Sequence, residues 1–250
     1  MTAVTDSGKA AREIAHGRML LRDEPEHIWG WGTAAGRLRA ARRAALISSG
    51  AGLRAGMRAL ELGCGTGMFT EVFASTGATI TGVDISEDLL ERARRRNLPS
   101  NHVEFIAARI EDLRLQEPCD AVIGSSVLHH LDVDQALENI SRLLKPAGIL
   151  SLAEPNMLNP QVFLERHPGP FRRLFYYVSD DETAFVRWQL TASLQRHGFT
   201  DIQITPFDWL HPRMPTFLIP LALRAGHIAE ATPGLREFAG SLHILARRTV

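Results

Sequence analysis

The stretch Glu61-Leu62-Gly63-Cys64-Gly65-Thr66-Gly67 decides the fold of this chain. It follows the apolar run 58–62, which is typical of a strand, and precedes residues 68–75, whose apolar spacing is typical of a helix. Glycines let the backbone turn sharply and let a ligand approach the main chain without meeting a Cβ atom. The N–H groups at the start of the following helix favour an anionic group such as a carboxylate. The stretch therefore predicts a ligand-binding turn between a strand and a helix.

The spacing of the glycines indicates which class of ligand fits this turn. A dinucleotide-binding turn reads GxGxxG and would require glycine at position 68, where Met68 stands. The spacing GxGxG therefore favours a ligand without a pyrophosphate. Asp84 closes the next predicted strand, and a carboxylate there can accept hydrogen bonds from the 2′- and 3′-hydroxyls of a ribose.

Apolar runs and helical patterns alternate along the rest of the chain. We expect strands over 58–62, 78–84, 103–107, 120–125, 149–153, 201–206 and 242–247, and helices over 33–49, 68–75, 86–96, 134–144 and 182–197. In the first of these helices the arginines are expected on the face opposite the apolar residues. Strands separated by helices predict an α/β fold with a doubly wound, mostly parallel seven-stranded sheet and an antiparallel C-terminal strand.

The chain divides into a main domain and a predicted cap. Residues 1–50 are expected to form an N-terminal arm and helix that contribute to the cap, and residues 51–250 the main domain. Insertions near 155–181 and 207–240 carry many large apolar side chains without a clear period, so we expect a helical or irregular cap over the strand ends. These side chains could line an acceptor pocket, in which a carboxylate or phosphate would be received by Arg166, Arg172, Arg173 and Arg213. They could instead form the cap's own core or a dimer contact.

Composition excludes several classes of protein. Lys plus Arg and Asp plus Glu number 28 each, so the chain lacks the net basic character of nucleic-acid-binding proteins. Two cysteines are too few for a disulfide-stabilised secreted domain. Neither a signal peptide nor an apolar run long enough to span a bilayer is evident. We therefore expect a cytoplasmic protein with no nucleic-acid partner; peripheral membrane contact and a homodimer stay open.

In their order along the chain, these motifs resemble the class I S-adenosylmethionine-dependent methyltransferases, in particular the branch that acts on small molecules and lipids. The resemblance covers residues 58–153 and implies a Rossmann-like fold with S-adenosyl-L-methionine as the cofactor. It implies that Glu61 and the turn from Gly63 to Gly67, with Cys64 and Gly65, hold the methionine part. Asp84 would hold the ribose, and Ile85 would pack against the adenine.

Two further segments carry the resemblance. After the third strand the family often has an acidic residue that binds the adenine amino group. Aligned on Glu111-Asp112-Leu113, that position holds Arg109, a departure from the family pattern. The backbone of Ile110 could then contact the adenine, as could Ala108 by packing on the ring. After the fourth strand, Ser125 and Val127 would line the cofactor. The Pro-Pro-aromatic motif of enzymes that methylate nucleobase amines is absent there, which argues against base methylation.

The resemblance implies methyl transfer to a small, hydrophobic acceptor that is polyketide-, quinone- or lipid-like. A hydroxyl acceptor needs a general base, and a histidine suits that role. His130 and His129 are the candidate catalytic residues, because the segment after the fourth strand borders the transferred methyl group in this fold; His167 is a third candidate. The histidines show no HxxxH or HxH spacing, so no metal is expected.

Two alternatives from other classes stay open. An NAD(P)-dependent oxidoreductase would explain the sheet and Asp84, but neither Met68 nor the segment around His129. A non-catalytic partner subunit that keeps the cofactor fold would explain Arg109.

Overall fold

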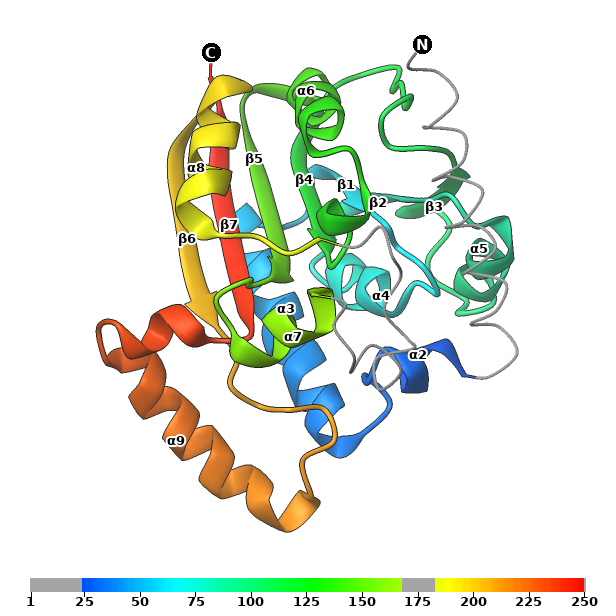
Figure 1. The fold of residues 1–250 in the computed structure, drawn as a ribbon. Coiled ribbons are helices and arrows are strands. Elements are labelled where there is room, and N and C mark those ends of the chain that lie inside the picture. The colour runs from blue at the N-terminus through cyan, green and yellow to red at the C-terminus, as the bar shows by residue number, and fades with distance from the viewer. Residues whose placement is uncertain (1–23, 168–182, 250) are drawn as a thin grey trace.

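The computed structural model describes residues 24–167 and 183–249, and within these ranges seven strands form one sheet (Figure 1). The strands are β1 (Arg58–Leu62), β2 (Thr79–Asp84), β3 (Val103–Ala107), β4 (Cys119–Ser125), β5 (Leu144–Pro155), β6 (Phe199–Phe207) and β7 (Ser241–Arg248), in the spatial order β3-β2-β1-β4-β5-β7-β6. Strand β7 runs antiparallel to both β5 and β6, whereas the pairs among β1 to β5 are parallel. The predicted fold class is confirmed.

Helices cover both faces of the sheet, and successive strand residues pack against opposite layers. Leu60 belongs to a core with α6 (Val133–Leu143) and α8 (Arg187–Arg196), whereas its neighbour Ala59 belongs to a second core with α3 (Ala34–Ala51) and α4 (Met68–Ala74). This alternation is the period of two expected of a strand buried on both faces. Helix α5 (Glu87–Arg94) packs against β2 and β3 at the edge of the sheet.

Side-chain caps fix where several helices begin. The Thr33 hydroxyl accepts a hydrogen bond from Gly36 N at 2.9 Å, the Ser86 hydroxyl from Leu89 N at 3.4 Å, and the Asp132 carboxylate from Gln135 N at 3.1 Å. The cap at Ser86 matters for the site, because it starts α5 directly after β2 and so fixes the turn that carries Asp84. The sequence predicts a helix over 86–96, and the structure has its first residue at Glu87.

Two elements in the second half of the chain were not predicted with their observed bounds. Residues 207–240, where a helical or irregular cap was expected, contain helix α9 (Ile219–Ala231) between the short 3₁₀ helices η3 (Thr216–Leu218) and η4 (Leu235–Phe238). Apolar residues occur all round α9, so no polar face marked it in the sequence. Strand β5 begins at Leu144, earlier than expected, with an irregular register opposite Cys119 and a left-handed Ala147 (φ +61°).

The cap insertion after β5 contains α7 (Pro160–Arg166), and its residues 168–181 lie outside the described part of the chain, as do residues 1–23 of the N-terminal arm. Across the described ranges, every helix is too short or too polar to cross a membrane.

The topology brings three strand ends together. Strand β1 lies between β2 and β4, and Leu62 pairs with Val83 on one side and with Gly124 on the other. The chain leaves β1 towards β2 and β3 and later returns to β4 on the opposite side, so no connection crosses the ends of β1 and β4. In open α/β sheets ligands bind at such a switch point.

We predict that Leu137→Ala lowers the free energy of unfolding by about 2–5 kcal/mol, because the fully buried Leu137 fastens α6 to the sheet and its removal leaves a cavity. The matched control is Glu138→Ala, at an exposed position that pairs with Arg142 on the same helix; this change should cost less than about 1 kcal/mol. Urea denaturation measures both, and equal midpoints for the two variants would contradict the packing described for α6.

Candidate functional site

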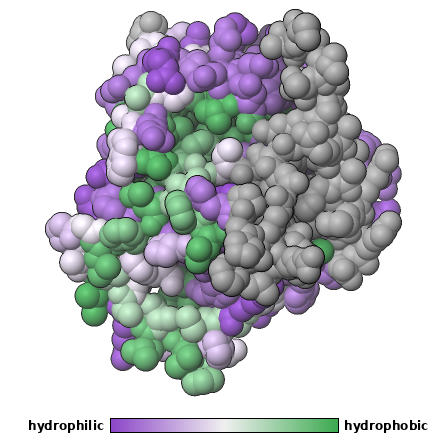
Figure 2. All heavy atoms as spheres, viewed as in Figure 1, coloured by the Kyte–Doolittle hydropathy of each residue, from purple (hydrophilic) through white to green (hydrophobic). Residues whose placement is uncertain are grey.

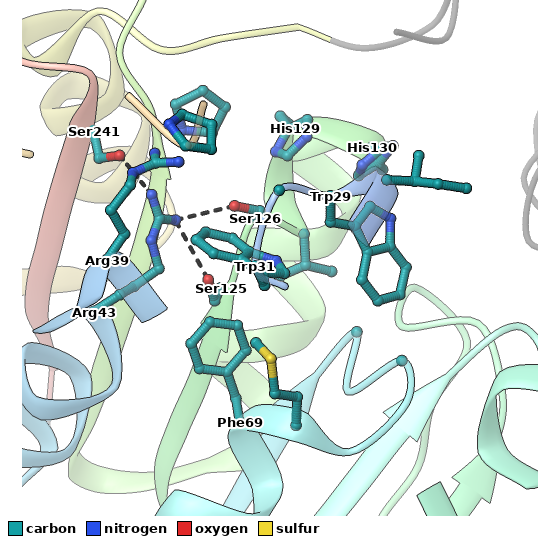
Figure 3. Close-up of a pocket in the computed structure, with 18 of the residues that line it drawn as sticks. Trp29, Trp31, Arg39, Arg43, Phe69, Ser125, Ser126, His129, His130 and Ser241 are labelled. Carbon is teal, nitrogen blue, oxygen red and sulfur yellow. Dashed lines mark hydrogen bonds between the residues drawn. The ribbon is translucent and has the colours of Figure 1, made fainter. Parts of the chain in front are cut away.

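A cavity of about 580 Å³ opens at the carboxyl ends of the strands, a volume suited to a small organic ligand (Figure 3). Its wall includes eleven of the thirteen residues predicted to bind the cofactor or, in the segment after β4, to accept a proton: Gly63, Cys64, Gly65, Asp84, Ile85, Arg109, Ile110, Ser125, Val127, His129 and His130. The other two, Glu61 and Gly67, do not line the cavity. No group of three or more potential metal ligands occurs among the residues that the structure describes.

The glycine turn needs its glycines for both conformation and space. Gly63 and Gly65 have positive φ angles of +60° and +51°. A Cβ atom on Gly63 would lie 2.6 Å from Cγ2 of Val127, and one on Gly65 would lie 3.3 Å from Cη2 of Trp29. Gly67 (φ +75°) starts α4, and a Cβ atom there would lie 3.0 Å from Cβ of Ala93. Gly67 therefore serves the packing of α5 against the turn, whereas Gly63 and Gly65 form the wall.

Asp84 lies at the end of β2 with its carboxylate towards the turn. Its Oδ2 atom accepts a hydrogen bond from Gly65 N, and its Oδ1 atom accepts one from Ser86 N, each at 2.9 Å. Burial raises the pKa of Asp84, while the amides of Ser86 and Gly65 and the nearby His130 partly offset the rise. Each carboxylate oxygen has two acceptor positions, so Asp84 can accept two more hydrogen bonds, as a diol would supply.

Glu61 is a buried acid in the middle of the sheet. It is 2% exposed, and its Oε2 atom has no hydrogen-bond partner among the described residues. Burial raises the pKa of Glu61 to about 8, and the charge of Asp84 adds to the rise. An unsatisfied buried carboxyl group requires an explanation, and a cationic ligand group bound at the turn would provide one.

The loop after β4 is held by Glu154, which lies at the end of β5. Its Oε1 atom accepts hydrogen bonds from Val127 N at 2.9 Å and Leu128 N at 2.8 Å, and its Oε2 atom lies 2.7 Å from Nδ1 of His129. Although burial opposes it, the His129 imidazole and these amides hold the pKa of Glu154 below its ordinary value. His129 is therefore fixed in the wall, and the ring of His130 lies against it with the centroids 4.1 Å apart.

Arg109, which departs from the family pattern, lies beside the acidic residue Glu111. Arg109 lies in the wall with Nε 3.8 Å from Oε2 of Glu111 and Nη1 3.6 Å from Oδ2 of Asp112. Glu111 also lines the cavity, and only 10% of its side chain is exposed. A carboxylate therefore lies in the wall beside Arg109, although Arg109 itself occupies the position aligned with the family's acidic residue.

The described part of the N-terminal arm, residues 24–32, closes one side of the cavity. Its short helix α2 (Pro25–Ile28) carries Glu26, which accepts a hydrogen bond from the Thr66 hydroxyl at 3.0 Å and forms an ion pair with Arg96. The ring of Trp29 thereby comes to lie over Gly65.

The arginines of helix α3 do not all lie on the face that the sequence predicts. Its arginines were expected on the solvent face, but Arg43 is 2% exposed whereas Leu38 is 46% exposed. The guanidinium groups of Arg39 and Arg43 lie 5.3 and 5.4 Å from the centroid of the Trp31 ring, and Figure 3 shows them together beside that ring. Burial of Arg43 is tolerated because it donates hydrogen bonds to residues on several strands. No feature of the apolar periodicity distinguished this residue from the other arginines of the helix.

The cap lines the cavity only in part. Val162, Trp209 and Leu210 belong to the wall, as do Arg166 and Arg213. Other large side chains expected there point outward: Phe217 is 80% exposed, and Figure 2 shows hydrophobic residues gathered over α9 at the lower left. His167 stacks on Phe163 outside the wall, which separates it from His129 and His130.

Comparison with known proteins identifies the central part of the chain. Residues 60–152 match the family model described as methyltransferase domain. The chain is 34% identical over 122 residues to the ubiquinone biosynthesis O-methyltransferase of Bordetella pertussis (strain Tohama I), covering 47% of this chain and 50% of that protein. It is 36% identical over 106 residues to the enzyme of the same name from Xanthomonas oryzae pv. oryzae (strain PXO99A), covering 41% and 44%. The match thus spans about half the length of these curated relatives.

Solved structures extend the similarity of fold beyond the matched segment. The N-methyltransferase NodS of Bradyrhizobium japonicum WM9, in complex with S-adenosyl-L-homocysteine, is 19% identical, with a TM-score of 0.62 over 94% of this chain and 96% of that one. A Thermotoga maritima structure described as an S-adenosylmethionine-dependent methyltransferase is 16% identical, with a TM-score of 0.66 over 94% and 100%. Both show the Rossmann-like fold over nearly the full chain. Together with the family match, they show that residues 60–152 are similar to a methyltransferase domain and lie within a Rossmann-like fold.

Proposed function

We propose that this protein uses S-adenosyl-L-methionine to methylate a hydroxyl group of a small, hydrophobic acceptor. The observation that carries the proposal is the arrangement of the glycine turn, Asp84 and the loop from Ser125 to His130 around one cavity at the switch point of the sheet. The O-methyltransferase relatives support a hydroxyl acceptor.

The residues present fit this cofactor. Asp84 has acceptor positions left for the ribose diol, Glu61 offers a buried carboxyl group for the ammonium group, and Ile85 and Ile110 provide apolar contacts for the adenine. The glycine turn keeps Cβ atoms out of the space in front of the main chain. When bound, the cofactor supplies an activated methyl group, so the chemistry demanded of the protein is alignment and exclusion of water.

The chain's own contribution to the reaction is to orient the acceptor and remove its proton. Orientation of two reactants can lower a barrier by about 7–11 kcal/mol, so a shaped cavity supplies much of the catalysis. We assign the acceptance of the hydroxyl proton to His130, which lies in the wall, and to His129 the role of fixing that ring's position through Glu154.

The oxidoreductase alternative is disfavoured by the turn itself. Met68 replaces the third glycine of a dinucleotide motif, and Trp29 lies over Gly65 where a pyrophosphate would approach the main chain. A calorimetric titration separates the alternatives: we expect binding of S-adenosylhomocysteine and none of NADH. The reverse result would overturn the proposed function.

We predict that Asp84→Asn weakens S-adenosylhomocysteine binding by about tenfold or more, because hydrogen bonds to a charged acceptor contribute about 1.5–3 kcal/mol. Glu87→Gln is the matched control, since it removes an exposed carboxylate three residues away that pairs with Arg94 on α5. Calorimetry measures both affinities. Unchanged affinity for Asp84→Asn would show that the nucleoside lies elsewhere.

We predict that S-adenosylhomocysteine binding at pH 7 releases nearly one proton from Glu61. Its pKa of about 8 leaves the carboxyl group protonated at neutral pH, and an ammonium group bound beside it lowers that pKa. The release should therefore decline as the pH rises above 8, where Glu61 is already ionised. Calorimetry in buffers of different ionisation enthalpy measures the proton count, and Glu61→Gln should abolish it. Release that persists in this variant would assign the proton to another group.

We predict that His130→Gln lowers kcat for a catechol-type acceptor by about 10²-fold, within the usual range for loss of a general base, with little change in S-adenosylhomocysteine affinity. His102→Gln, at an exposed histidine after α5, is the control and should leave kcat unchanged. Methyl incorporation from labelled cofactor gives the rates. Full activity in His130→Gln would move the proton acceptor to His129 or to solvent.

A further inference from the structure

Large apolar side chains form a stripe along the exposed side of helix α9. Phe217, in η3 directly before the helix, is 80% exposed, and Leu221 and Ile228 are 65% and 67% exposed. Their spacing along the chain places these residues on one face of a helix. The neighbouring η4 adds Leu235 and Phe238, which are also exposed. We call these five residues the α9 patch, and Figure 2 shows hydrophobic residues gathered over α9.

The side of α9 that faces the protein uses mostly smaller groups. The buried residues of the helix are Ile219, Gly226 and Ala229, and a Cβ atom on Gly226 would lie 3.2 Å from Cβ of Trp209. A helix that only covers its own domain buries its largest apolar side chains, because their removal from water holds it in place. The α9 patch instead points away from the protein. A contiguous exposed apolar surface of this kind marks a site of interaction with another body.

The acidic residues beside the α9 patch are turned towards the protein. Among residues 211–238 the acids are Glu230 and Glu237, whose side chains are 16% and 19% exposed. Oε1 of Glu230 accepts a hydrogen bond from Arg42 on α3 at 2.8 Å, and Oε2 of Glu237 lies 2.7 Å from Nε of Arg187 on α8. Both negative charges are therefore paired with arginines of other helices.

The cations of the same segment are exposed. Arg213, Arg224 and Arg236 all face solvent, and Arg224 lies within the apolar stripe. Arg236 also lies 3.5 Å from Glu237. The outer surface of this segment thus combines apolar side chains with positive charge, which complements an anionic surface. A symmetric contact between two copies of the α9 patch would bring the same arginines together, and like charges oppose such a contact.

A lipid bilayer fits this combination of groups. Helix α9 lies at the edge of the molecule, away from the sheet (Figure 1). A bilayer accepts such a helix without a matching contour, because apolar side chains enter the boundary between headgroups and acyl chains while arginines attract anionic lipids. The loop from Trp209 to Arg213 lines the cavity and leads into η3 and α9, so contact here brings part of the cavity wall next to the lipid.

We propose that the α9 patch docks on a membrane surface that contains anionic lipids. Phe217, Leu221 and Ile228 enter the interface, and Arg213, Arg224 and Arg236 pair with the anionic headgroups. This inference does not depend on the proposed function, because lipid binding is measured without cofactor or acceptor.

Co-sedimentation of the full chain with vesicles tests the proposal. The vesicles contain either phosphatidylcholine alone or phosphatidylcholine and phosphatidylglycerol in equal amounts. We expect wild-type protein to bind the mixed vesicles at least about tenfold more strongly, because each arginine near an anionic surface adds to the attraction. Added salt should reduce the difference. Failure to bind the mixed vesicles at low salt, or equal binding to both kinds, would overturn the proposal.

The double variant Phe217→Ser with Ile228→Ser should weaken binding to the mixed vesicles by at least about tenfold, since two apolar side chains no longer enter the interface. The matched control is Val72→Ser, which removes an exposed apolar side chain on α4, outside the α9 patch, and should leave binding unchanged. Full binding by the double variant would place the lipid contact elsewhere.

Arg224→Gln tests the charge separately and should weaken binding to the mixed vesicles by about fivefold. Its control is Arg95→Gln, at an exposed arginine directly after α5, which should bind as the wild type does. Equal binding by Arg224→Gln and wild-type protein would contradict the assignment of the charge to this surface. Sedimentation velocity covers the remaining occupant: a wild-type dimer that the double variant dissociates would assign the α9 patch to a second copy of the chain and overturn the proposal.

Discussion

The site depends on the contact between Gly63 and Val127. With no side chain at Gly63, the Val127 methyl groups lie directly against the turn after β1, and the loop after β4 closes onto it. Glu154 fixes the other side of that loop by accepting hydrogen bonds from two successive amides. The ends of β1, β4 and β5 are therefore held as one unit, and the walls of the cavity keep their spacing without a ligand.

Three buried ionisable groups lie in or close to the cavity wall: Glu61, Glu154 and Arg43. The charge state of each is set by different contacts. The Oε2 atom of Glu61 has no hydrogen-bond partner among the described residues, and burial raises the pKa of Glu61 to about 8 although Thr70 opposes the rise. Glu154 is equally buried but stays ionised, because His129 and two amides offset the loss of water. Arg43 donates its hydrogen bonds to neutral groups, while the charges of Asp208 and Glu154 oppose the fall of its pKa to about 10. A buried carboxyl group of raised pKa thus lies at the glycine turn, and a buried cation lies on α3.

The sequence predicted most of the sheet because its strands are bounded by glycine, proline and helix caps, and β1 and β3 have the bounds that were expected. It placed Asp84 and the glycine turn together because the carboxyl ends of adjacent parallel strands meet at one edge. It could not place Arg43, because burial of an arginine depends on Ser125, Ser126, Ala153 and Ser241, which come together only when β4, β5 and β7 are assembled. Helix α9 was not predicted with its bounds, because apolar residues occupy its exposed face and the sequence therefore shows no amphipathic pattern.

The N-terminal arm closes the cavity through contacts that break more easily than those of its other walls. Trp29 covers the main chain at Gly65, and the arm is held to the body of the protein through Glu26, Thr66 and Arg96. Partly exposed ion pairs contribute little to stability, whereas the opposite wall is held by the fully buried Glu154. The side of the cavity beside Gly65 is therefore the side that opens at the smallest cost in free energy.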